Sequence, residues 1–413
     1  MDINFFKDNN LEIKKALLAK NLQLDLDEIE KLDQKRKKLQ LEVDNLRSQK
    51  NSLTRKLGKN AQPQVIKIKQ SLKQLEPKLK DTLSKIQALL DKIPNLPKAD
   101  VPVGKDESQN IIIKKWGRPP IFDFQPKDHI HLGKSLDLID LEKASQISGS
   151  RFYYLKNEAV LLEFALINFA TKFLVEERFT PLLPPVLIKP SSMRPMGYLE
   201  HGEDNEVYHL EKDDLYLIGT SEQSIGPYHQ NETIEAKKLP LRYFAFSTCF
   251  RREAGSYGKD IKGIIRVHQF DKLEMFSFTL PGQSDKEHEY LLSLEEKLMQ
   301  KLKIPYQVVK MCTGDLGLTA ARKYDIEAWL PSQQKYRETH STSTCTDYQS
   351  RRLNIRYRKD NKKGFIHTLN GTALAIPRIL IAILENNQQK DGTIQVPEKL
   401  VEYTGFEKIK PKK

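Results

Sequence analysis

Paired heptad repeats near the start of the chain constrain the fold more than any other feature of the sequence. Mostly apolar side chains, with Arg36, Lys50 and Thr82 among them, step alternately by three and four residues over 29–57 and again over 65–93, with a turn containing Gly and Pro between the two runs. This spacing is typical of coiled-coil seams. Two such helices joined by a short turn predict an antiparallel hairpin at about 27–93. Pro77 is expected to kink or loosen the second helix.

The predicted hairpin also holds most of the excess positive charge. The 413 residues carry a net charge of +13, and the segment Lys31–Lys92 has 17 Lys and Arg against 6 Asp and Glu, a net of +11. A charged coiled coil is usually only a solvated surface, but a one-sided excess favours a polyanion through neutralised phosphates and released counterions. The segment contains no aromatic residue, so we expect contacts to the backbone of structured RNA. The candidate contacts are Arg47, Lys50, Arg55, Lys56, Lys59, Lys67, Lys69 and Lys73.

Cysteine usage and hydropathy exclude several classes of protein. Cys249, Cys312 and Cys345 lie far apart, which argues against a disulfide scaffold or a zinc site built on Cys pairs and suits a reducing compartment. No apolar run reaches the roughly 18 residues of a membrane span. The first residues lack the basic and apolar regions of a signal peptide. We therefore expect a cytoplasmic protein that binds no zinc and no membrane.

A proline-rich segment follows the predicted hairpin. Three prolines and one glycine lie within residues 94–104, and residues of these types interrupt regular structure. We therefore expect two domains, 1–104 with the hairpin and 105–413 beyond the linker. Ahead of the hairpin, residues 1–25 have the pattern of a short amphipathic helix.

The second predicted domain mixes helical and strand patterns. Residues 241–250 and 264–278 are expected to form two long strands with a hydrophilic loop between them. Residues 365–369 are expected to form another strand, followed by a Gly turn and a helix that ends near residue 388. Strands joined by loops, with helices that do not alternate regularly, predict an antiparallel α+β sheet.

Short motifs for nucleotide and metal binding fail on their spacing. The run 133–135 ends like a phosphate-binding P-loop, yet Asp128 stands where the first Gly is required. The run Gly255–Gly258 lacks the third Gly of a dinucleotide-binding fingerprint. His129 and His131 have metal-ligand spacing, but no third ligand is near them in the sequence.

The strongest signal surrounds Arg251, at the end of the predicted strand 241–250. An Arg beside a Gly-containing loop can hold a phosphate through two hydrogen bonds. The surrounding residues resemble motif 2 of the class II aminoacyl-tRNA synthetases, in the form found in seryl-tRNA synthetases: CFRREAGSYGKDIKGIIRVHQFDKLE. Other segments resemble that family's linker and remaining landmarks in the same order: IPNLPKADVPVGKDES, SGSRFYYL, LLPPVLI, LIGTSE, YRETHSTSTCTDYQSRRLNIRYR and TLNGTALAIPRILIAILEN. The resemblance covers essentially the whole chain.

This resemblance implies a fold, an activity and partners. The fold is α+β, with an N-terminal antiparallel α-helical coiled-coil hairpin and a class II catalytic domain, an antiparallel β-sheet flanked by helices. The activity is that of a serine–tRNA ligase, which activates L-serine with ATP and magnesium (Mg2+) to seryl-adenylate and transfers the seryl group to tRNA(Ser). Whether tRNA(Sec) is also charged stays open. A homodimer is implied because residues 179–185 resemble the interface motif of class II enzymes.

The resemblance assigns roles around ATP. Arg251 would bridge the α-phosphate and the serine carboxylate, Arg378 would hold the γ-phosphate, and Glu338 completes the catalytic set. Glu338 and Ser341 would contact magnesium, a hard cation that prefers oxygen ligands. Phe270 would stack on the adenine. The implied ATP-binding residues are Arg251, Arg252, Glu253, His268, Phe270, Glu338, Thr339, His340, Ser341 and Arg378.

The resemblance also assigns the amino-acid site. Thr220 and Glu222 would hold the α-ammonium group of serine. Glu274 matches an acid that contacts the substrate, and the hydroxyl of Thr372 would bond the substrate side chain. Recognition of a buried hydroxyl discriminates against alanine, which would leave its partners unpaired. The implied serine-binding residues are Thr220, Ser221, Glu222, Arg251, Glu274, Asn370 and Thr372.

Four positions depart from the family pattern. Gly219 stands where Pro is frequent, Arg252 where Ser is commoner, and Thr372 where many members have Ser. His340 stands in an expected loop, where small residues are usual, which puts the geometry of that loop in question. The scattered cysteines argue against the family's zinc-using branch.

Two other functions stay open at this point. One is a ligase that loads an amino acid onto a carrier protein, although related proteins of that kind lack the long basic arm. The other is a non-catalytic RNA-binding paralogue, which we would expect to have lost Arg251, Glu274 or Arg378, and all three are present.

Overall fold

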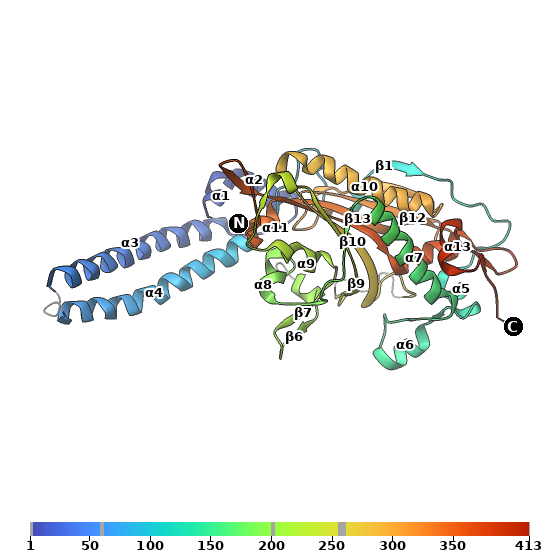
Figure 1. The fold of residues 1–413 in the computed structure, drawn as a ribbon, viewed down its shortest axis with the longest axis horizontal. Coiled ribbons are helices and arrows are strands. Elements are labelled where there is room, and N and C mark those ends of the chain that lie inside the picture. Colours follow the sequence, from blue (N-terminus) through green and yellow to red (C-terminus); the bar gives the residue numbers. More distant parts are fainter. Residues whose placement is uncertain (1–2, 58–61, 200–202, 255–261, 413) are drawn as a thin grey trace. The chain divides into compact units, whose positions relative to one another are not determined.

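The chain forms two compact units, Met1–Leu96 and Pro97–Lys413, which are described separately (Figure 1). The boundary falls inside the predicted linker. The computed structural model describes residues 3–57, 62–199, 203–254 and 262–412. Lys59 and the run Gly255–Gly258 therefore lie outside the described residues.

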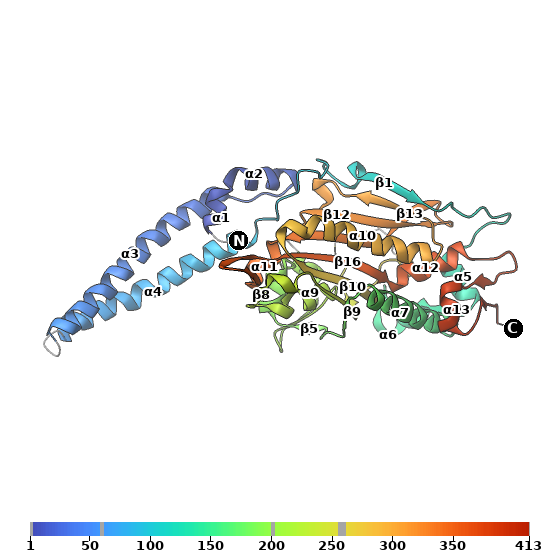
Figure 2. The same ribbon diagram turned by 45° about the horizontal axis from the view of Figure 1, so that its top comes forward.

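The first unit is a helical hairpin on a small base. Its two long helices run side by side and confirm the paired heptads (Figures 1 and 2). Their seam buries Val43, Leu72 and Leu79. Where a single short helix was predicted over 1–25, the structure has two, and their apolar faces pack against the base of the hairpin. The helices are α1 (Ile3–Asp8), α2 (Asn10–Ala19), α3 (Leu26–Leu57) and α4 (Gln62–Asp91).

Pro77 does not end the second long helix, because α4 continues on both sides of it. Arg47 of α3 pairs with Glu76 of α4 at 2.7 Å, next to this proline. The pair is exposed on both sides, so it contributes little to stability. The register of the hairpin therefore depends mainly on its apolar seam.

The second unit is built on an eight-stranded sheet, antiparallel except for the parallel pairing of β4 with β9. Antiparallel neighbours far apart in sequence bring distant motifs to one face of this sheet. In spatial order the strands are β1 (Ile111–Trp116), β11 (Tyr306–Lys310), β12 (Arg322–Leu330), β13 (Lys335–Thr346), β16 (His367–Ala375), β10 (Gln269–Thr279), β9 (Leu241–Phe250) and β4 (Thr180–Leu182).

Helices cover this sheet and shorter strands border it. Helix α10 (Ser284–Lys301) packs against β10, β12, β13 and β16, and α12 (Ile376–Asn386) follows β16 directly, with Pro377 in its first turn, a position that suits proline. The other helices are α5 (His129–Ser135), α6 (Leu141–Ser148), α7 (Glu158–Glu176), α8 (Pro190–Met193), α9 (Glu222–Ile225), α11 (Tyr348–Leu353) and α13 (Glu398–Thr404). The smaller sheets are β5 (Leu187–Ile188), β7 (Leu215–Leu217) and β6 (His209–Leu210); β15 (Lys362–Phe365), β14 (Arg356–Lys359) and β8 (Thr233–Glu235); β2 (Ile139–Asp140) and β3 (Tyr154–Leu155); and β17 (Ile394–Gln395) and β18 (Lys408–Ile409).

Two details of the strand prediction were wrong. The strand expected from residue 264 begins only at Gln269, because 264–267 form a pocket wall instead of joining the sheet. The Gly turn expected after 365–369 does not exist, since β16 runs through Gly371 to Ala375. A Cβ at Gly371 would lie 2.9 Å from Glu295 Oε1. Glycine at this strand position therefore allows the Glu295 side chain to approach the backbone closely.

Among the helices that the described residues form, none combines the length and the apolar character needed to cross a membrane.

Candidate active site

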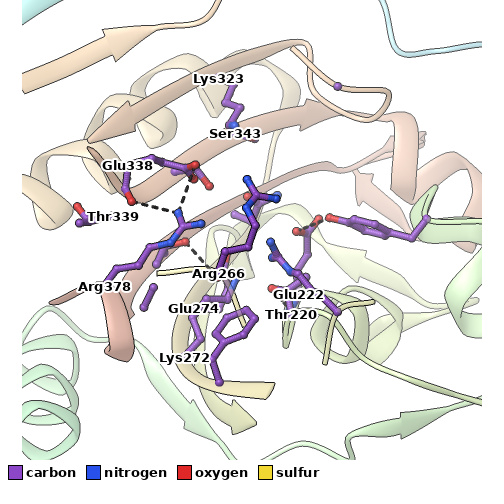
Figure 3. A pocket seen from close by; sticks show the side chains of 18 of the residues that line it. Thr220, Glu222, Arg266, Lys272, Glu274, Lys323, Glu338, Thr339, Ser343 and Arg378 are labelled. Carbon is purple, nitrogen blue, oxygen red and sulfur yellow. Dashed lines mark hydrogen bonds and ion pairs between the residues drawn. The ribbon is translucent and has the colours of Figure 1, made fainter. Parts of the chain in front are cut away.

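A pocket of about 360 Å³ opens on the face of the sheet formed by β10, β13 and β16 (Figure 3). The other lining residues come from the positions just after β9, from β12, from the starts of α9 and α12, and from the segments 197–198, 264–267 and 316–320. Its volume is within the range of small-molecule sites. Twelve of the sixteen residues implied for ATP and serine line it: Thr220, Glu222, Arg251, Glu253, Phe270, Glu274, Glu338, Thr339, Ser341, Asn370, Thr372 and Arg378.

Charged side chains dominate this pocket. Its lining cations pair with carboxylates in four cases: Arg266 with Glu253 at 2.6 Å, Lys323 with Asp325 at 3.2 Å, Arg378 with Glu338 at 3.3 Å, and Lys272 with Glu274. Over the described part of the chain, the fifth cation, Arg251, has no carboxylate in ion-pair contact. It is therefore the lining cation whose charge is most available to an anionic ligand.

Arg251 is held in place by its backbone and side chain. Its amide N–H donates to the carbonyl of His268 at 2.9 Å, and its own carbonyl contacts Nδ1 of His268 at 2.9 Å. Its Nε donates to the carbonyl of Gly219 at 3.1 Å. The guanidinium carbon lies 5.3 Å from the centre of the Phe270 ring. Among the described residues no partner is found for the remaining guanidinium nitrogens, and Arg251 lines the pocket.

A β-bulge explains how Glu338 and Ser341 share one face. The pairing of β12 with β13 shifts between Glu338 and His340, so Thr339 is the extra residue. Without it, side chains three residues apart would point to opposite faces of the strand. Figure 3 shows Arg378 turned toward Glu338.

Glu338 is kept ionised by the surrounding cations. Desolvation raises the pKa of its carboxyl, but the charges of Arg378, Lys323 and Arg251 outweigh this effect and lower the pKa to about 2. Its side chain is 44% exposed. An accessible carboxylate therefore remains available at neutral pH.

At the other end of the pocket, two buried carboxyls face a threonine. Tyr198 and Gln349 each donate a hydrogen bond of 2.8 Å to Glu222. Burial raises the pKa of Glu222, and the nearby charge of Glu274 raises it further. The hydroxyl of Thr372 donates to Glu274 at 3.4 Å. Paired acids next to a hydroxyl suit a small ligand with an ammonium group and a polar side chain.

Four of the implied residues do not line the pocket. Arg252 lies over the ring of Tyr208, 5.7 Å from its centre, and His268 holds the backbone of Arg251. Ser221 is buried with its hydroxyl directed to the carbonyl of Ala245 at 3.5 Å. Their expected direct contacts with ATP or serine are therefore not supported by this geometry.

His340, the fourth of these residues, lies in strand β13 and not in a loop. It is buried, and burial lowers its pKa to about 3. Thr339 contacts its Nδ1 at 2.9 Å. The bulge at Thr339 directs the His340 side chain away from the pocket, so its unusual size does not narrow the site.

Several lining residues were missed by the sequence reasoning. Lys272 lies between Phe270 and Glu274 on the same face of β10, and the alternation of side chains along a strand could have indicated it. Lys323 enters the site only because β12 pairs with β13. The other missed polar residues are Tyr198, Arg266, Thr319 and Ser343.

The predicted RNA-contact residues belong to the first unit. All of them except Lys59 lie within α3 or α4, and the backbone alone is described for Lys56. Arg47 is the member of the set that pairs with an acid. No cluster of three or more His, Cys, Asp and Glu side chains that could hold a metal is found among residues 3–57, 62–199, 203–254 and 262–412.

Comparison with known proteins identifies the family. The model of the seryl-tRNA synthetase N-terminal domain matches residues 1–97, and the model of the tRNA synthetase class II core domain (G, H, P, S and T) matches residues 206–387. The serine–tRNA ligase of Dictyoglomus turgidum is 44% identical over 424 aligned positions, which cover 100% of both chains. The chain belongs to the seryl-tRNA synthetase family. It is therefore a class II aminoacyl-tRNA synthetase, a ligase, as the sequence motifs indicated.

Solved structures of seryl-tRNA synthetases share the fold. The enzyme from Pyrococcus horikoshii, solved in complex with ATP, matches with a TM-score of 0.90 and 40% identity over 100% of each chain. The cytoplasmic serine–tRNA ligase of Naegleria fowleri, in complex with AMP, matches with a TM-score of 0.87 and 32% identity, over 100% of this chain and 99% of the other. The predicted fold class, a helical hairpin with an antiparallel-sheet catalytic domain, is confirmed.

Proposed function

We propose that this protein is a serine–tRNA ligase whose pocket on β10, β13 and β16 condenses L-serine with ATP. The observation that carries the proposal is the Arg251 guanidinium, which has no ion-pair partner among the described residues. It donates to the carbonyl of Gly219, next to Thr220, and its charge acts on Glu338. Figure 3 shows Thr220 and Glu222 on one side of the pocket and Glu338 and Arg378 on the other. Two anions must meet for the reaction, and a fixed cation between them offsets their repulsion.

In the first step an oxygen of the serine carboxylate attacks the α-phosphorus of ATP. A P–O bond forms to the carboxylate, the bond to the β-phosphate oxygen breaks, and pyrophosphate leaves with that electron pair. No side-chain base is required because the carboxylate is already a nucleophile. In the second step a ribose hydroxyl of the tRNA attacks the seryl carbonyl, AMP leaves, and the adenylate phosphate takes the hydroxyl proton.

The pocket residues support these two steps by binding and orienting the substrates. The carboxylates of Glu222 and Glu274 would hold the serine ammonium, and Thr372 would bond its hydroxyl. Phe270 would stack on the adenine, and Glu253 would accept from its amino group. Each of these five residues lines the pocket.

Magnesium fits the phosphate end of the pocket. Glu338 offers an ionised, accessible carboxylate and Ser341 a hydroxyl on the same face, and oxygen donors of this kind suit a hard cation. ATP phosphates and water would complete the shell. Bound there, the ion would neutralise charge on the phosphates.

We expect ATP–pyrophosphate exchange that depends on L-serine. Threonine carries an extra methyl group and alanine lacks the hydroxyl, so both should support exchange at a small fraction of the serine rate. Removing magnesium with EDTA should abolish exchange, and added magnesium should restore it. No exchange at saturating serine would overturn the proposal and favour a non-catalytic RNA-binding paralogue. Exchange without transfer to tRNA(Ser) would favour a carrier-protein ligase.

The basic hairpin supports tRNA(Ser) as the acceptor of the seryl group. Helices α3 and α4 carry the predicted contacts over a long, narrow surface. Arginine and lysine on such a surface bind phosphates without reading bases. Whether tRNA(Sec) is also accepted is tested by charging the two tRNAs side by side.

We propose a homodimer formed through the face that includes α7. Leu161 and Phe164 of α7 are 49% and 58% exposed, and Leu183 beyond β4 is 83% exposed. Exposed apolar groups gathered in this way mark interaction surfaces, and the segment 179–185 resembles the class II interface motif.

Light scattering should therefore give a mass of twice the 47.8 kDa of one chain. Phe164→Asp should shift the population toward monomers, because a buried charge without a partner is costly at an interface. Ile121→Asp is the matched control, since Ile121 is 99% exposed and belongs to the segment between β1 and α5 rather than to α7 or 179–185. A wild-type monomer, or equal effects of the two variants, would contradict the homodimer.

We place the reaction in the cytoplasm. All three cysteines are free and buried, which suits a reducing compartment. Fractionation of the cells that express the protein, with detection by antibody, tests this assignment; recovery outside the cytoplasmic fraction would refute it.

A further inference from the structure

A buried histidine behind the pocket contacts the backbone of one pocket wall. His129, the first residue of α5, is 4% exposed, and its Nε2 accepts from the backbone N–H of Ile264 at 3.3 Å. Ile264 belongs to the segment 264–267 that lines the pocket. His129 itself does not line that pocket. It therefore contacts the wall from outside.

Glu385 of α12 determines which ring nitrogen of His129 carries the hydrogen. The fully buried carboxylate of Glu385 accepts from the backbone N–H of His129 at 3.1 Å and lies 3.2 Å from its Nδ1. It also accepts from the backbone N–H and hydroxyl of Ser332, at 3.2 and 2.6 Å. With an acceptor at Nδ1, the neutral ring carries its hydrogen there and leaves Nε2 to accept from Ile264.

Helix α12 thus fixes the wall at two points. Near its start, Arg378 donates from Nε to the carbonyl of Ile265 at 3.4 Å. Two turns later, Glu385 acts through His129 on the N–H of Ile264. The next wall residue, Arg266, pairs with Glu253, the acid assigned to the adenine under the proposed function.

Gly263 shows how tight this contact is. Its φ is +78°, and a Cβ placed there would lie 2.0 Å from Nε2 of His129. Any other residue at this position would displace either the ring or the wall. The histidine and the glycine are therefore matched to each other.

We propose that His129 is a positioning residue for ATP, holding the Ile264–Arg266 wall through the N–H of Ile264. The inference rests on the proposed function, in that it assigns this wall to the nucleotide. It predicts different effects on the two substrates, because among the described residues no hydrogen bond or ion pair joins His129 to Glu222, Glu274 or Thr372, which are assigned to serine. Loss of the contact should weaken ATP and leave serine unaffected.

The test compares two substitutions, each of which keeps a polar group at the position of one ring nitrogen of His129. The amide of His129→Asn overlays Nδ1 and reaches Glu385, whereas the amide of His129→Gln overlays Nε2 and can accept from Ile264. In exchange assays we expect H129N to raise KM for ATP about five- to tenfold, the effect of one lost hydrogen bond, with KM for serine changed less than about twofold. H129Q should restore KM for ATP to within about threefold of wild type.

His131→Asn on the same helix is the control, because the His131 side chain is 75% exposed and, among the described residues, pairs with Asp128, three positions earlier. Thermal melting reports whether each variant is folded. If H129N is unstable, Gly263→Ala, which leaves His129 intact, should reproduce the increase in KM for ATP. Unchanged KM for ATP in folded H129N and G263A, equal changes for both substrates, or no rescue by H129Q would each overturn the inference. Calorimetry measures ATP binding by the same variants and does not depend on the exchange reaction. A wild-type protein that is inactive in exchange would therefore refute the proposed function and leave this inference testable.

Discussion

Replacing Arg251 with alanine should lower serine-dependent ATP–pyrophosphate exchange by about 10²- to 10³-fold, the loss typical of a removed charge-stabilising donor. Arg251 is the lining cation that no carboxylate of the described residues neutralises. Each of the other four lining cations is paired with a carboxylate, so none of them can replace Arg251 without breaking its own ion pair. Steady-state exchange with labelled pyrophosphate measures the loss, and circular dichroism checks that the fold is intact.

Two variants separate the geometry of Arg251 from its charge. Arg251→Lys keeps the charge but loses the planar fork, so it should recover only part of the activity. Arg252→Ala removes the adjacent guanidinium, which lies over Tyr208 outside the pocket, and should reduce exchange less than about tenfold. Exchange by R251A close to the wild-type rate, or a defect in R252A as large as that in R251A, would refute the phosphate-clamp role.

Periodic patterns predicted the elements that depend on local spacing. The paired heptads led to α3 and α4, and alternation over 241–250 matched β9 at both ends. The start of β10 was predicted too early because Ile264, Ile265 and Val267 are as apolar as strand residues. Their burial comes from the pocket wall and the surrounding core, which spacing along the chain does not reveal.

Gly371 shows a second limit of sequence reasoning. A glycine between two polar residues, here Asn370 and Thr372, is compatible with either a turn or a close approach within a strand. What decides between them is Glu295, which approaches from α10, far away in the sequence. Information of this kind exists only once α10 has packed on the sheet.

The site residues divide in the same way. Motif resemblance led to Arg251, Glu338 and Arg378, which the structure brings to one pocket. It also included His340, which the bulge at Thr339 turns away from the pocket. A motif specifies which residues are adjacent in sequence, whereas the face that each one occupies depends on the pairing of β12 with β13.

Shortening the arm should separate serine activation from tRNA charging. We expect a variant in which residues 45–80 are replaced by a short Gly-rich turn to keep exchange within about twofold of wild type and to lose at least about a hundredfold in kcat/KM for tRNA(Ser). The cut ends lie side by side because Val43 and Leu79 share the seam, and the base core around Ile29 and Ile86 is retained. Exchange and aminoacylation, measured on the same preparation, give the two rates.

A full-length arm with fewer positive charges distinguishes the effect of charge from the effect of arm length. Lys50, Lys67, Lys69 and Lys73 are exposed or half-buried on α3 and α4, and none has an ion-pair partner among the described residues; changing all four to Gln preserves length and helix propensity. If phosphate contacts drive binding, KM for tRNA should rise and its logarithmic salt dependence should become shallower by about one unit for each contact removed. Normal charging by the shortened arm would exclude the hairpin from tRNA binding. A charging defect in the shortened variant, together with normal charging by the four-Gln variant, would indicate that the shape of the arm binds the tRNA. The positive charge would then be only a solvated surface.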